Sequence, residues 1–363
     1  MGKILFVTWD GGGNRVPTSA IARELGRRGH DVRVLGHDSQ AGDYQGIRVT
    51  FVPYPSLPGF RLDASGTGLY RLFTNRRMAE DTIALLTIQP ADAVVVDCML
   101  ISVQDALDKR GIPFAILEHS LHDVMVKAFR TLGLVLWPRY GVGRLRADAR
   151  PIVAASIPSL LPFTAAAVPN DPRPGEVVFT GAMIPAVAAA PPSPTVVVSL
   201  STYRFPALVA TWQQVLDAVD GLPARVVATL GPAIAPGELR VPASVELHDW
   251  MPHEELLRDA SLVVGHGGHG TTLAALAHGV PLLILPLDGM SDQPKVGAEI
   301  QRAGLGRRLP RRSSASEIRG AIDRLLVDEG VHDAAQRLGA SIRTMNGPAR
   351  GAHAVEAVAR PVG

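Results

Sequence analysis

The chain has 363 residues, of which 47% are apolar and 19% charged, a composition that supports sizeable cores and excludes disorder of the whole chain. Lys and Arg total 36 against 34 Asp and Glu, so the sequence lacks the basic excess typical of nucleic-acid-binding proteins. The length suits two domains. The longest apolar run, residues 280–287, is far shorter than the roughly 20 residues that span a bilayer, so we expect no integral membrane segment.

In the first half of the chain, short β-branched runs alternate with helical stretches. The expected strands are residues 4–9, 31–35, 47–52, 93–96 and 113–117, and the expected helices are 17–28, 78–86 and 100–109. Residues 93–96 are apolar at every position, which is typical of a strand buried on both faces. This alternation predicts a parallel sheet with helices on both faces.

The pattern dissolves between residues 161 and 194, where Pro and Ala are frequent, and then resumes. Here the expected strands are 195–200, 225–230, 245–248, 262–265 and 281–285, the expected helices are 206–219 and 271–278, and the chain is helical from about 314. We predict an N-terminal domain (1–165), a linker region (166–194), a C-terminal domain (195–345) and a C-terminal helix (346–363). The predicted fold class is α/β, with two Rossmann-like parallel-sheet domains facing across a cleft.

The only cysteine is Cys98, so no intramolecular disulfide and no cysteine-based zinc cage can form. A single cysteine fits a reducing compartment, and we expect a cytoplasmic protein. Cys98 itself is expected to be a small buried residue rather than a nucleophile.

Ligands of such sheets bind at the carboxyl ends of the strands, so the loops that follow strands are the candidate sites. After the first strand comes Asp10-Gly11-Gly12-Gly13-Asn14-Arg15-Val16-Pro17. Val16 breaks the dinucleotide-binding fingerprint, and no P-loop is present, which disfavours an NAD-dependent oxidoreductase. A tight turn between strand and helix is the alternative interpretation of this segment.

The loop after the strand at 262–265 gives a sharper signal. It reads His266-Gly267-Gly268-His269-Gly270-Thr271-Thr272 and leads into a helix. Backbone N–H groups and the positive dipole end at a helix N-terminus attract phosphate, and the hydroxyls add donors. The alternative is that Thr271 or Thr272 only caps the helix. Glycines between the two histidines argue against a metal site, so no metal is predicted.

Two further segments flank this loop. Trp250-Met251-Pro252-His253 follows a strand, and its Trp can lie against a planar base or anchor a core. Asp292 and Gln293 form an acceptor and donor pair that suits sugar hydroxyls, with a solvated loop as the alternative.

Taken in order, these segments resemble the GT-B glycosyltransferases that use nucleotide-activated sugars on small natural products. The block from Trp250 to Gln293 matches the family pattern W-x-P-[QH]…H-x-G-x-x-[ST]-T…P…D-Q. The resemblance assigns the base to Trp250 and Met251, and the sugar to Asp292 and Gln293. It assigns the diphosphate to residues on the loop and on the segment after the strand at 195–200, namely Thr202, His266, Gly268, His269, Gly270, Thr271 and Thr272.

This chain departs from the family pattern at two positions. Many members that use UDP-sugars carry a ribose-binding Glu where this chain has Ala274, which favours a dTDP-sugar as donor. The family pattern also places a His or Asp general base where this chain has Asn14, whose amide can hold an acceptor hydroxyl but cannot take its proton. Either another group is the base or the acceptor is acidic enough to need little help. Asp97, Asp10 and His119 also follow strands and are the candidate bases, although Asp97 could instead cap the helix at 100–109.

The resemblance implies an inverting, metal-independent transfer of a sugar from a nucleotide diphosphate to a small apolar acceptor, with no separate cofactor. An aromatic or polyketide-like acceptor is favoured by apolar residues that could equally be core, namely Phe51, Tyr54, Phe60, Leu69, Tyr70, Leu72, Phe73, Leu132, Leu134, Leu136 and Trp137. The alternatives are a non-catalytic auxiliary protein, which Asn14 motivates, and a nucleotide-sugar epimerase. The sequence leaves a homodimer open.

Overall fold

The computed structural model describes residues 1–61, 66–127, 129–130, 140–141, 151–161, 176–289 and 291–359. The chain divides into two compact units. The first takes in Met1–Pro158, Ala166–Met183 and Asn346–Gly363, and the second Ser159–Ala165 and Ile184–Met345. Within the described residues, no helix combines the length and apolar character that crossing a membrane requires.

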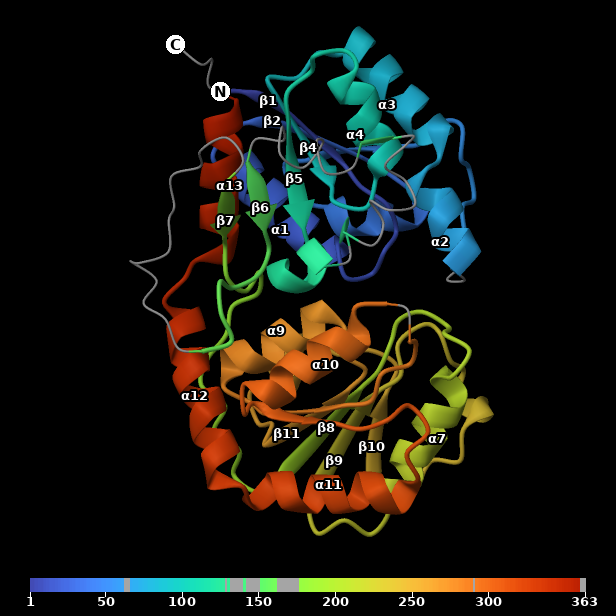
Figure 1. Ribbon diagram of the computed structural model, residues 1–363, viewed down its shortest axis with the longest axis vertical. Coiled ribbons are helices and arrows are strands. Elements are labelled where there is room, and N and C mark those ends of the chain that lie inside the picture. Colours follow the sequence, from blue (N-terminus) through green and yellow to red (C-terminus); the bar gives the residue numbers. More distant parts are fainter. Residues whose placement is uncertain are drawn as a thin grey trace. The chain divides into compact units, whose positions relative to one another are not determined.

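The first unit is built on a seven-stranded parallel sheet with the strand order β3-β2-β1-β4-β5-β6-β7 (Figure 1). Ile4 on β1 pairs with Val32 on one side and with Ala93 on the other, so β1 lies between β2 and β4. The strands are β1 (Lys3–Val7), β2 (Asp31–Gly36), β3 (Thr50–Pro53), β4 (Ala93–Asp97), β5 (Phe114–Glu118), β6 (Ile152–Ala154) and β7 (Val177–Phe179).

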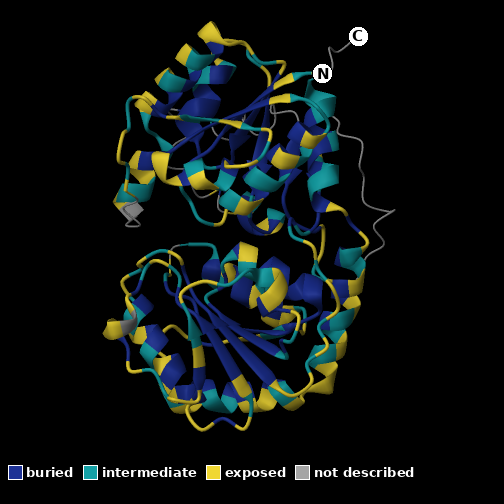
Figure 2. Ribbon diagram, turned by 180° about the vertical axis from the view of Figure 1, so that it is seen from behind, coloured by how far each residue is buried: buried dark blue, intermediate teal, exposed yellow. Residues whose placement is uncertain are grey.

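Alternate side chains of this sheet enter two different cores. Leu5 and Val96 pack with the helices of one face, and Ile4 and Phe6 pack with those of the other. The helices are α1 (Arg15–Arg27), the short 3-10 helix η1 (Asp38–Tyr44), α2 (Gly66–Phe73), α3 (Arg76–Ile88), α4 (Ile101–Asp108) and α13 (Gly347–Val358). Helix α13 lies against α1 and the sheet although it comes from the far end of the sequence. The resulting sandwich is buried at its centre and exposed on the outer helix faces (Figure 2).

The second unit repeats this architecture with six parallel strands in the order β10-β9-β8-β11-β12-β13. They are β8 (Thr195–Ser199), β9 (Arg225–Thr229), β10 (Val245–His248), β11 (Leu262–Gly265), β12 (Leu282–Ile284) and β13 (Gly306–Arg308). The helices are α7 (Leu208–Val219), the 3-10 helix η3 (Pro236–Glu238), α8 (His253–Leu256), α9 (His269–His278), α10 (Gln293–Arg302), α11 (Ala315–Val327) and α12 (Glu329–Arg343).

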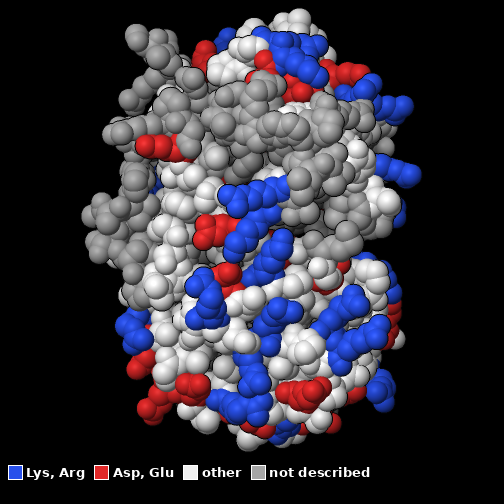
Figure 3. All heavy atoms as spheres, in the orientation of Figure 1, with Lys and Arg blue, Asp and Glu red and all other residues white. Residues whose placement is uncertain are grey.

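Charged side chains are spread among uncharged ones on the face of the second unit that Figure 3 shows. Lys and Arg gather on the face that Figure 3 shows, with Asp and Glu between them. The ion pairs of this unit include Arg225–Glu246 at 2.7 Å and Arg319–Asp323 at 3.2 Å. The surface of this face is therefore mixed in sign.

The structure confirms the predicted fold class of two parallel α/β sheets. The predicted strands 245–248 and 262–265 are found with their predicted bounds. The region predicted as linker contains a strand, β7, that completes the first sheet, while the strand expected at 47–52 is found at Thr50–Pro53. Three-residue strands such as β6 and β7 are too short to show a periodic pattern, which is why the sequence does not reveal them.

Candidate active site

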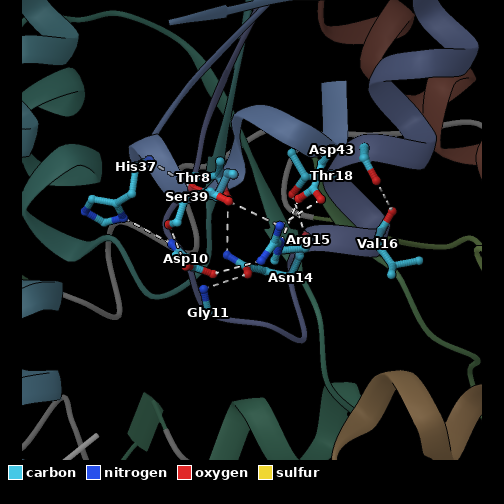
Figure 4. Close-up of polar contacts among 12 residues, drawn as sticks. Thr8, Asp10, Gly11, Asn14, Arg15, Val16, Thr18, His37, Ser39 and Asp43 are labelled. Carbon is cyan, nitrogen blue, oxygen red and sulfur yellow. Dashed lines mark hydrogen bonds and ion pairs between the residues drawn. The ribbon is translucent and has the colours of Figure 1, made fainter. Parts of the chain in front are cut away.

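The turn after β1 is held together by the side chain of Asn14 (Figure 4). Its Oδ1 accepts the N–H of Gly11 at 3.1 Å. Its Nδ2 lies 3.1 Å from Thr8 Oγ1, 2.8 Å from the Trp9 carbonyl oxygen and 2.7 Å from Asp97 Oδ2. Asn14 is fully buried. The Asn14 side chain therefore stabilises the glycine-rich turn through hydrogen bonds within it and connects it to the end of β4.

Asp97, the last residue of β4, is 1% exposed and accepts hydrogen bonds from three directions. Besides Asn14, these are the Met99 N–H at 2.9 Å and His119 Nε2 at 3.3 Å. Burial alone would raise the pKa of Asp97, but the positive His119 and these donors outweigh it and lower that pKa. The carboxylate is thus held ionised.

The alternative that Asp97 caps the following helix is wrong. Helix α4 has Leu100 as its N-cap residue, with no side-chain capping bond. The Asp97 carboxylate bonds to Met99 before that helix, to the turn after β1 and to the residue that follows β5, so it connects three loops rather than starting a helix.

His119 directly follows β5, the neighbour of β4 in the sheet. Its side chain is 14% exposed, against 1% for the carboxylate it faces. Burial would lower the pKa of His119, but the Asp97 carboxylate outweighs burial and raises that pKa well above 6.5. Cys98 lies beside this pair, is buried as expected, and has a thiol pKa raised by burial.

Asp10 belongs to a neighbouring network. Its carboxylate accepts a hydrogen bond from Ser39 at 2.6 Å and lies 3.6 Å from the Arg15 guanidinium. Arg15 in turn binds Asp43 at 2.7 Å, and the Asp10 N–H donates to His37 Nδ1 at 3.1 Å. The structure thus brings together Asn14, Asp97 and His119 and gives Asp10 other partners.

Among the described residues, one group of three offers metal-ligand atoms within 4.8 Å of one another, and it is Asp97, Cys98 and His119. The carboxylate oxygens in this group already accept hydrogen bonds from Asn14 and Met99. A metal here would have to displace the contact between Asp97 and His119.

In the second unit, the loop after β11 leads into α9, and its N-terminus has no side-chain cap. The N-cap residue is Gly268, so the alternative that Thr271 or Thr272 caps the helix is wrong. Both threonines lie within the first turn, Thr272 buried and Thr271 half-buried, 3.4 Å from His253 Nε2. An uncapped helix N-terminus leaves backbone N–H groups for an anion.

Two glycines of this loop cannot carry a side chain without disturbance. Gly267 has φ of +89°, and a Cβ there would lie 3.0 Å from the Gln293 carbonyl oxygen. A Cβ on Gly268 would lie 2.6 Å from the His266 ring. The loop is therefore packed closely between α10 and the His266 imidazole.

The imidazole of His266 is electrically neutral at pH 7. Burial lowers its pKa to about 4, and its buried Nδ1 has no hydrogen-bond partner. His269 is also buried, at 6% exposed, while Gly270 is exposed. Of these residues, Gly270 presents its backbone most openly to solvent.

The other predicted donor-site residues follow β8, β10 and β12 of the same parallel sheet, so they share its carboxyl edge. Trp250 after β10 is 72% exposed, Met251 is half-buried, and Thr202 after β8 is exposed. Asp292 is half-buried as the N-cap residue of α10. Gln293 is 3% exposed, and its Oε1 accepts the Leu287 N–H at 2.8 Å, so this side chain braces the loop after β12.

Sequence reasoning missed one polar side chain in the first unit. His37 is fully buried, its ring stacks on Phe60 at 3.8 Å, and its Nε2 has no partner. Its position after β2 was the available signal, because every other candidate also follows a strand.

Comparison with known proteins gives the chain its relatives. Residues 213–358 match the family described as "Erythromycin biosynthesis protein CIII-like, C-terminal domain". The chain is 26% identical to 4'-demethylrebeccamycin synthase of Lentzea aerocolonigenes over 90% of this chain and 92% of that protein. It is 30% identical to demethyllactenocin mycarosyltransferase of Streptomyces fradiae over 46% of this chain and 36% of that protein.

Solved structures share the whole fold. The calicheamicin glycosyltransferase CalG4 superposes with a TM-score of 0.75 at 22% identity, covering 100% of this chain and 99% of that one. The glycosyltransferase VinC in complex with dTDP superposes with a TM-score of 0.69 at 20% identity, covering 98% and 99%. The resemblance seen in the motifs is thereby confirmed. Residues 213–358 match the erythromycin biosynthesis protein CIII-like C-terminal domain, in a chain that has the GT-B fold and whose homologues are natural-product glycosyltransferases.

Proposed function

We propose that this chain is a glycosyltransferase that moves a sugar from a nucleotide diphosphate, a dTDP-sugar in preference to a UDP-sugar, to a small apolar acceptor. The observation that carries the proposal is the uncapped N-terminus of α9, reached through a glycine loop at the carboxyl edge of a parallel sheet. That loop lies in the part of the chain that matches the family.

The donor's diphosphate is the group that this loop suits. Helix N–H groups and the helix dipole stabilise the negative charge that builds up as the diphosphate leaves. Because the pKa of His266 is about 4, its imidazole is neutral at pH 7 and contributes an N–H rather than a charge. The exposed Trp250 offers a flat apolar face for the base. The residues do this work without a separate cofactor.

The preference for dTDP rests on Ala274. This residue is 3% exposed in α9, one turn after Thr271, and brings no carboxylate to the sheet edge. A carboxylate would bind both hydroxyls of ribose, and a 2′-deoxyribose loses less when it is missing. The complex of the structural neighbour VinC with dTDP is consistent with this preference.

The acceptor is proposed to be an aromatic or polyketide-like aglycone. Of the described apolar residues that suggested it, two are buried in the core and four are partly buried against it. Tyr54 and Leu72 are buried, and Phe73 packs edge-on against Trp9 at 5.3 Å. Tyr70, 41% exposed, remains available for contact. Leu132, Leu134, Leu136 and Trp137 lie outside the described residues.

Inversion at the anomeric carbon is part of the proposal. In a single displacement, the acceptor attacks from the face opposite the leaving diphosphate, so the configuration inverts. A general base must then take the proton of the attacking hydroxyl. The first unit supplies candidates for this base at the carboxyl edge of its sheet.

The first test is thermal unfolding with dTDP, UDP, GDP and NAD added separately. A ligand at 100 times its Kd stabilises by about 2.7 kcal/mol, which raises Tm by a few degrees. We expect the largest shift with dTDP, and sugar transfer in a mass-spectrometric assay with dTDP-sugars. A shift with UDP alone would overturn the donor preference, and no shift with any nucleoside diphosphate would overturn the donor site.

A further inference from the structure

Three side chains meet at the carboxyl edge of the first sheet, and they differ in how far they reach the surface. Asn14 is 0% exposed and Asp97 1%, while the His119 side chain is 14% exposed. A general base must come within hydrogen-bond distance of the acceptor's proton. Of the three, His119 alone presents surface to a molecule outside the protein.

Asn14 is already fully used within the fold. Its oxygen accepts the Gly11 N–H, and its nitrogen faces Thr8, the Trp9 carbonyl and Asp97. An amide has no basic lone pair that could take a proton at neutral pH. Asn14 therefore fixes the position of Asp97 and does not act on the acceptor.

Asp97 is equally committed. Its Oδ1 accepts the Met99 N–H at 2.9 Å and its Oδ2 accepts Asn14 Nδ2 at 2.7 Å. His119 Nε2 lies 3.3 Å from Oδ2 and 3.4 Å from Oδ1. A carboxylate placed so against an imidazole N–H orients the ring and selects its tautomer, which leaves Nδ1 as the basic nitrogen.

We propose that His119 is the general base of the reaction, oriented by Asp97, which Asn14 holds in place. This inference rests on the proposed sugar transfer. The family pattern places the base at position 14, in the turn after β1. In this chain the proposed base instead follows β5 and contacts the same Asp97 carboxylate. Asp97 and Asn14 are positioning residues, and His119 is the catalytic one.

With a hydroxyl acceptor, one bond forms and one bond breaks. The acceptor oxygen forms a bond to the anomeric carbon while the bond from that carbon to the diphosphate oxygen breaks, and the diphosphate leaves with the electron pair. The acceptor's proton passes to His119 Nδ1, and the resulting imidazolium is stabilised by Asp97. Solvent later removes that proton.

The charges around His119 determine its pH dependence. Asp97 and Cys98 come from the end of β4, Glu118 precedes His119 on β5, and His122 binds Glu118 at 2.7 Å. Asp97 outweighs burial and raises the pKa of His119 well above 6.5. Since a base works when deprotonated, kcat/KM should rise with pH through that raised pKa, which places the acidic limb on the alkaline side of 6.5.

The decisive comparison uses His119→Gln and, as a matched control, His122→Gln, which removes another histidine–carboxylate contact from the same edge. Transfer from a dTDP-sugar should fall by about 10²- to 10⁴-fold in the first and stay within a few-fold of the unaltered protein in the second. The dTDP-induced shift in Tm should remain in both. Equal losses in the two variants, or retention of turnover in His119→Gln, would overturn the assignment.

The dependence of the activity loss on the acidity of the acceptor distinguishes a base from a residue with only a structural role. A nitrophenol with a pKa of about 7 needs little help in losing its proton, whereas an aliphatic alcohol needs much. The His119→Gln loss should therefore be large for the alcohol and small for the nitrophenol. Equal losses for both acceptors would contradict a role as base.

Two further measurements cover the case in which His119→Gln fails to fold. In the unaltered protein, kcat/KM should rise with pH at values above 6.5. Asp97→Asn should lower turnover and move this rise to lower pH, because the carboxylate that raises the pKa of His119 is gone. A rise below pH 6.5, or one that Asp97→Asn does not move, would overturn the proposal.

Asp10→Asn separates the neighbouring network from this one. Asp10 is bound to Ser39 and Arg15. In Asp10→Asn, the rise of kcat/KM with pH should therefore still occur above pH 6.5, as in the unaltered protein. Loss of that rise in Asp10→Asn would transfer the role to Asp10. Absence of sugar transfer by the unaltered protein, with nucleotide binding intact, would instead overturn the proposed function itself.

Discussion

The two units of this chain each place a glycine-rich turn at the carboxyl edge of a parallel sheet, just before a helix, and the two turns differ in how their polar groups are used. In the first unit, the turn from Gly11 to Asn14 is closed by Asn14, whose amide binds the turn itself and Asp97. In the second, the loop at Gly267 and Gly268 leads into a helix whose N-terminus has no side-chain cap.

The difference shows why the same sequence feature does not imply the same role. A turn whose polar groups are satisfied internally is a rigid support, and it leaves chemistry to a neighbour such as His119. A loop whose helix N–H groups lack a side-chain cap, beside a buried His266 Nδ1 without a partner, is arranged for an anion.

The largest effect is expected from Gly267→Ala. Its φ of +89° disfavours any side chain, and the added Cβ would lie 3.0 Å from the Gln293 carbonyl oxygen. The loop should shift and the dTDP-induced rise in Tm should disappear. Gly221→Ala is the control, because Gly221 has φ of +62° in the same unit with nothing within 4 Å of its Cβ position. It should lower Tm yet keep the shift with dTDP. Loss of the shift in both variants would mean that strain alone explains the result.

The sequence predicted those parts of the molecule that local pattern determines. The strand Leu262–Gly265 is apolar and bounded by polar residues, so its position was clear. β7 is three residues long and is defined by pairing with β6, which no local pattern reveals. In the same way, the sequence placed Asn14 and Asp97 after neighbouring strands, but their exposures depend on side-chain packing. That packing is what favours His119 over Asp97 as the base.

The second prediction concerns the closed turn. Asn14→Asp would place a second carboxylate about where the Asn14 amide lies 2.7 Å from Asp97. Like charges at that distance raise the pKa of one carboxyl in the folded state. The free energy of unfolding should therefore fall as pH rises from 5 to 8, in addition to a loss of about 1–3 kcal/mol from the broken hydrogen bonds. Asn14→Ala, which breaks those bonds without adding charge, should show the loss without the added slope in urea unfolding. Equal slopes in the two variants would contradict the close approach of the two side chains.

The third prediction compares a buried histidine from each unit. Burial lowers the pKa of His37 and of His266 to about 4. Between about 6.5 and 4, the unfolded chain takes up protons that the folded chain refuses, so the free energy of unfolding should decrease as pH falls through this window. His37→Gln and His266→Gln should each reduce this dependence of the unfolding free energy on pH by the equivalent of about one proton. A saturating dTDP-sugar should alter the contribution of His266 and leave that of His37 unchanged. The opposite pattern would place the anion in the first unit.

The smallest effect is expected from Ala274→Glu, which restores the carboxylate that is typical of family members using UDP-sugars. Position 274 is nearly buried in α9, so the added side chain can reach a ribose only by extending toward the sheet edge. One additional hydrogen bond to a charged group is worth about 1.5–3 kcal/mol at best, and burial of the carboxylate offsets part of it. We therefore expect the ratio of Kd for dTDP to Kd for UDP, measured by calorimetry, to rise by a few-fold. Ala274→Gln has the same length without the charge and should change this ratio less. If neither substitution changes the ratio, the absence of a carboxylate at 274 is not the origin of the donor preference, and that preference must come from the contacts of the base near Trp250.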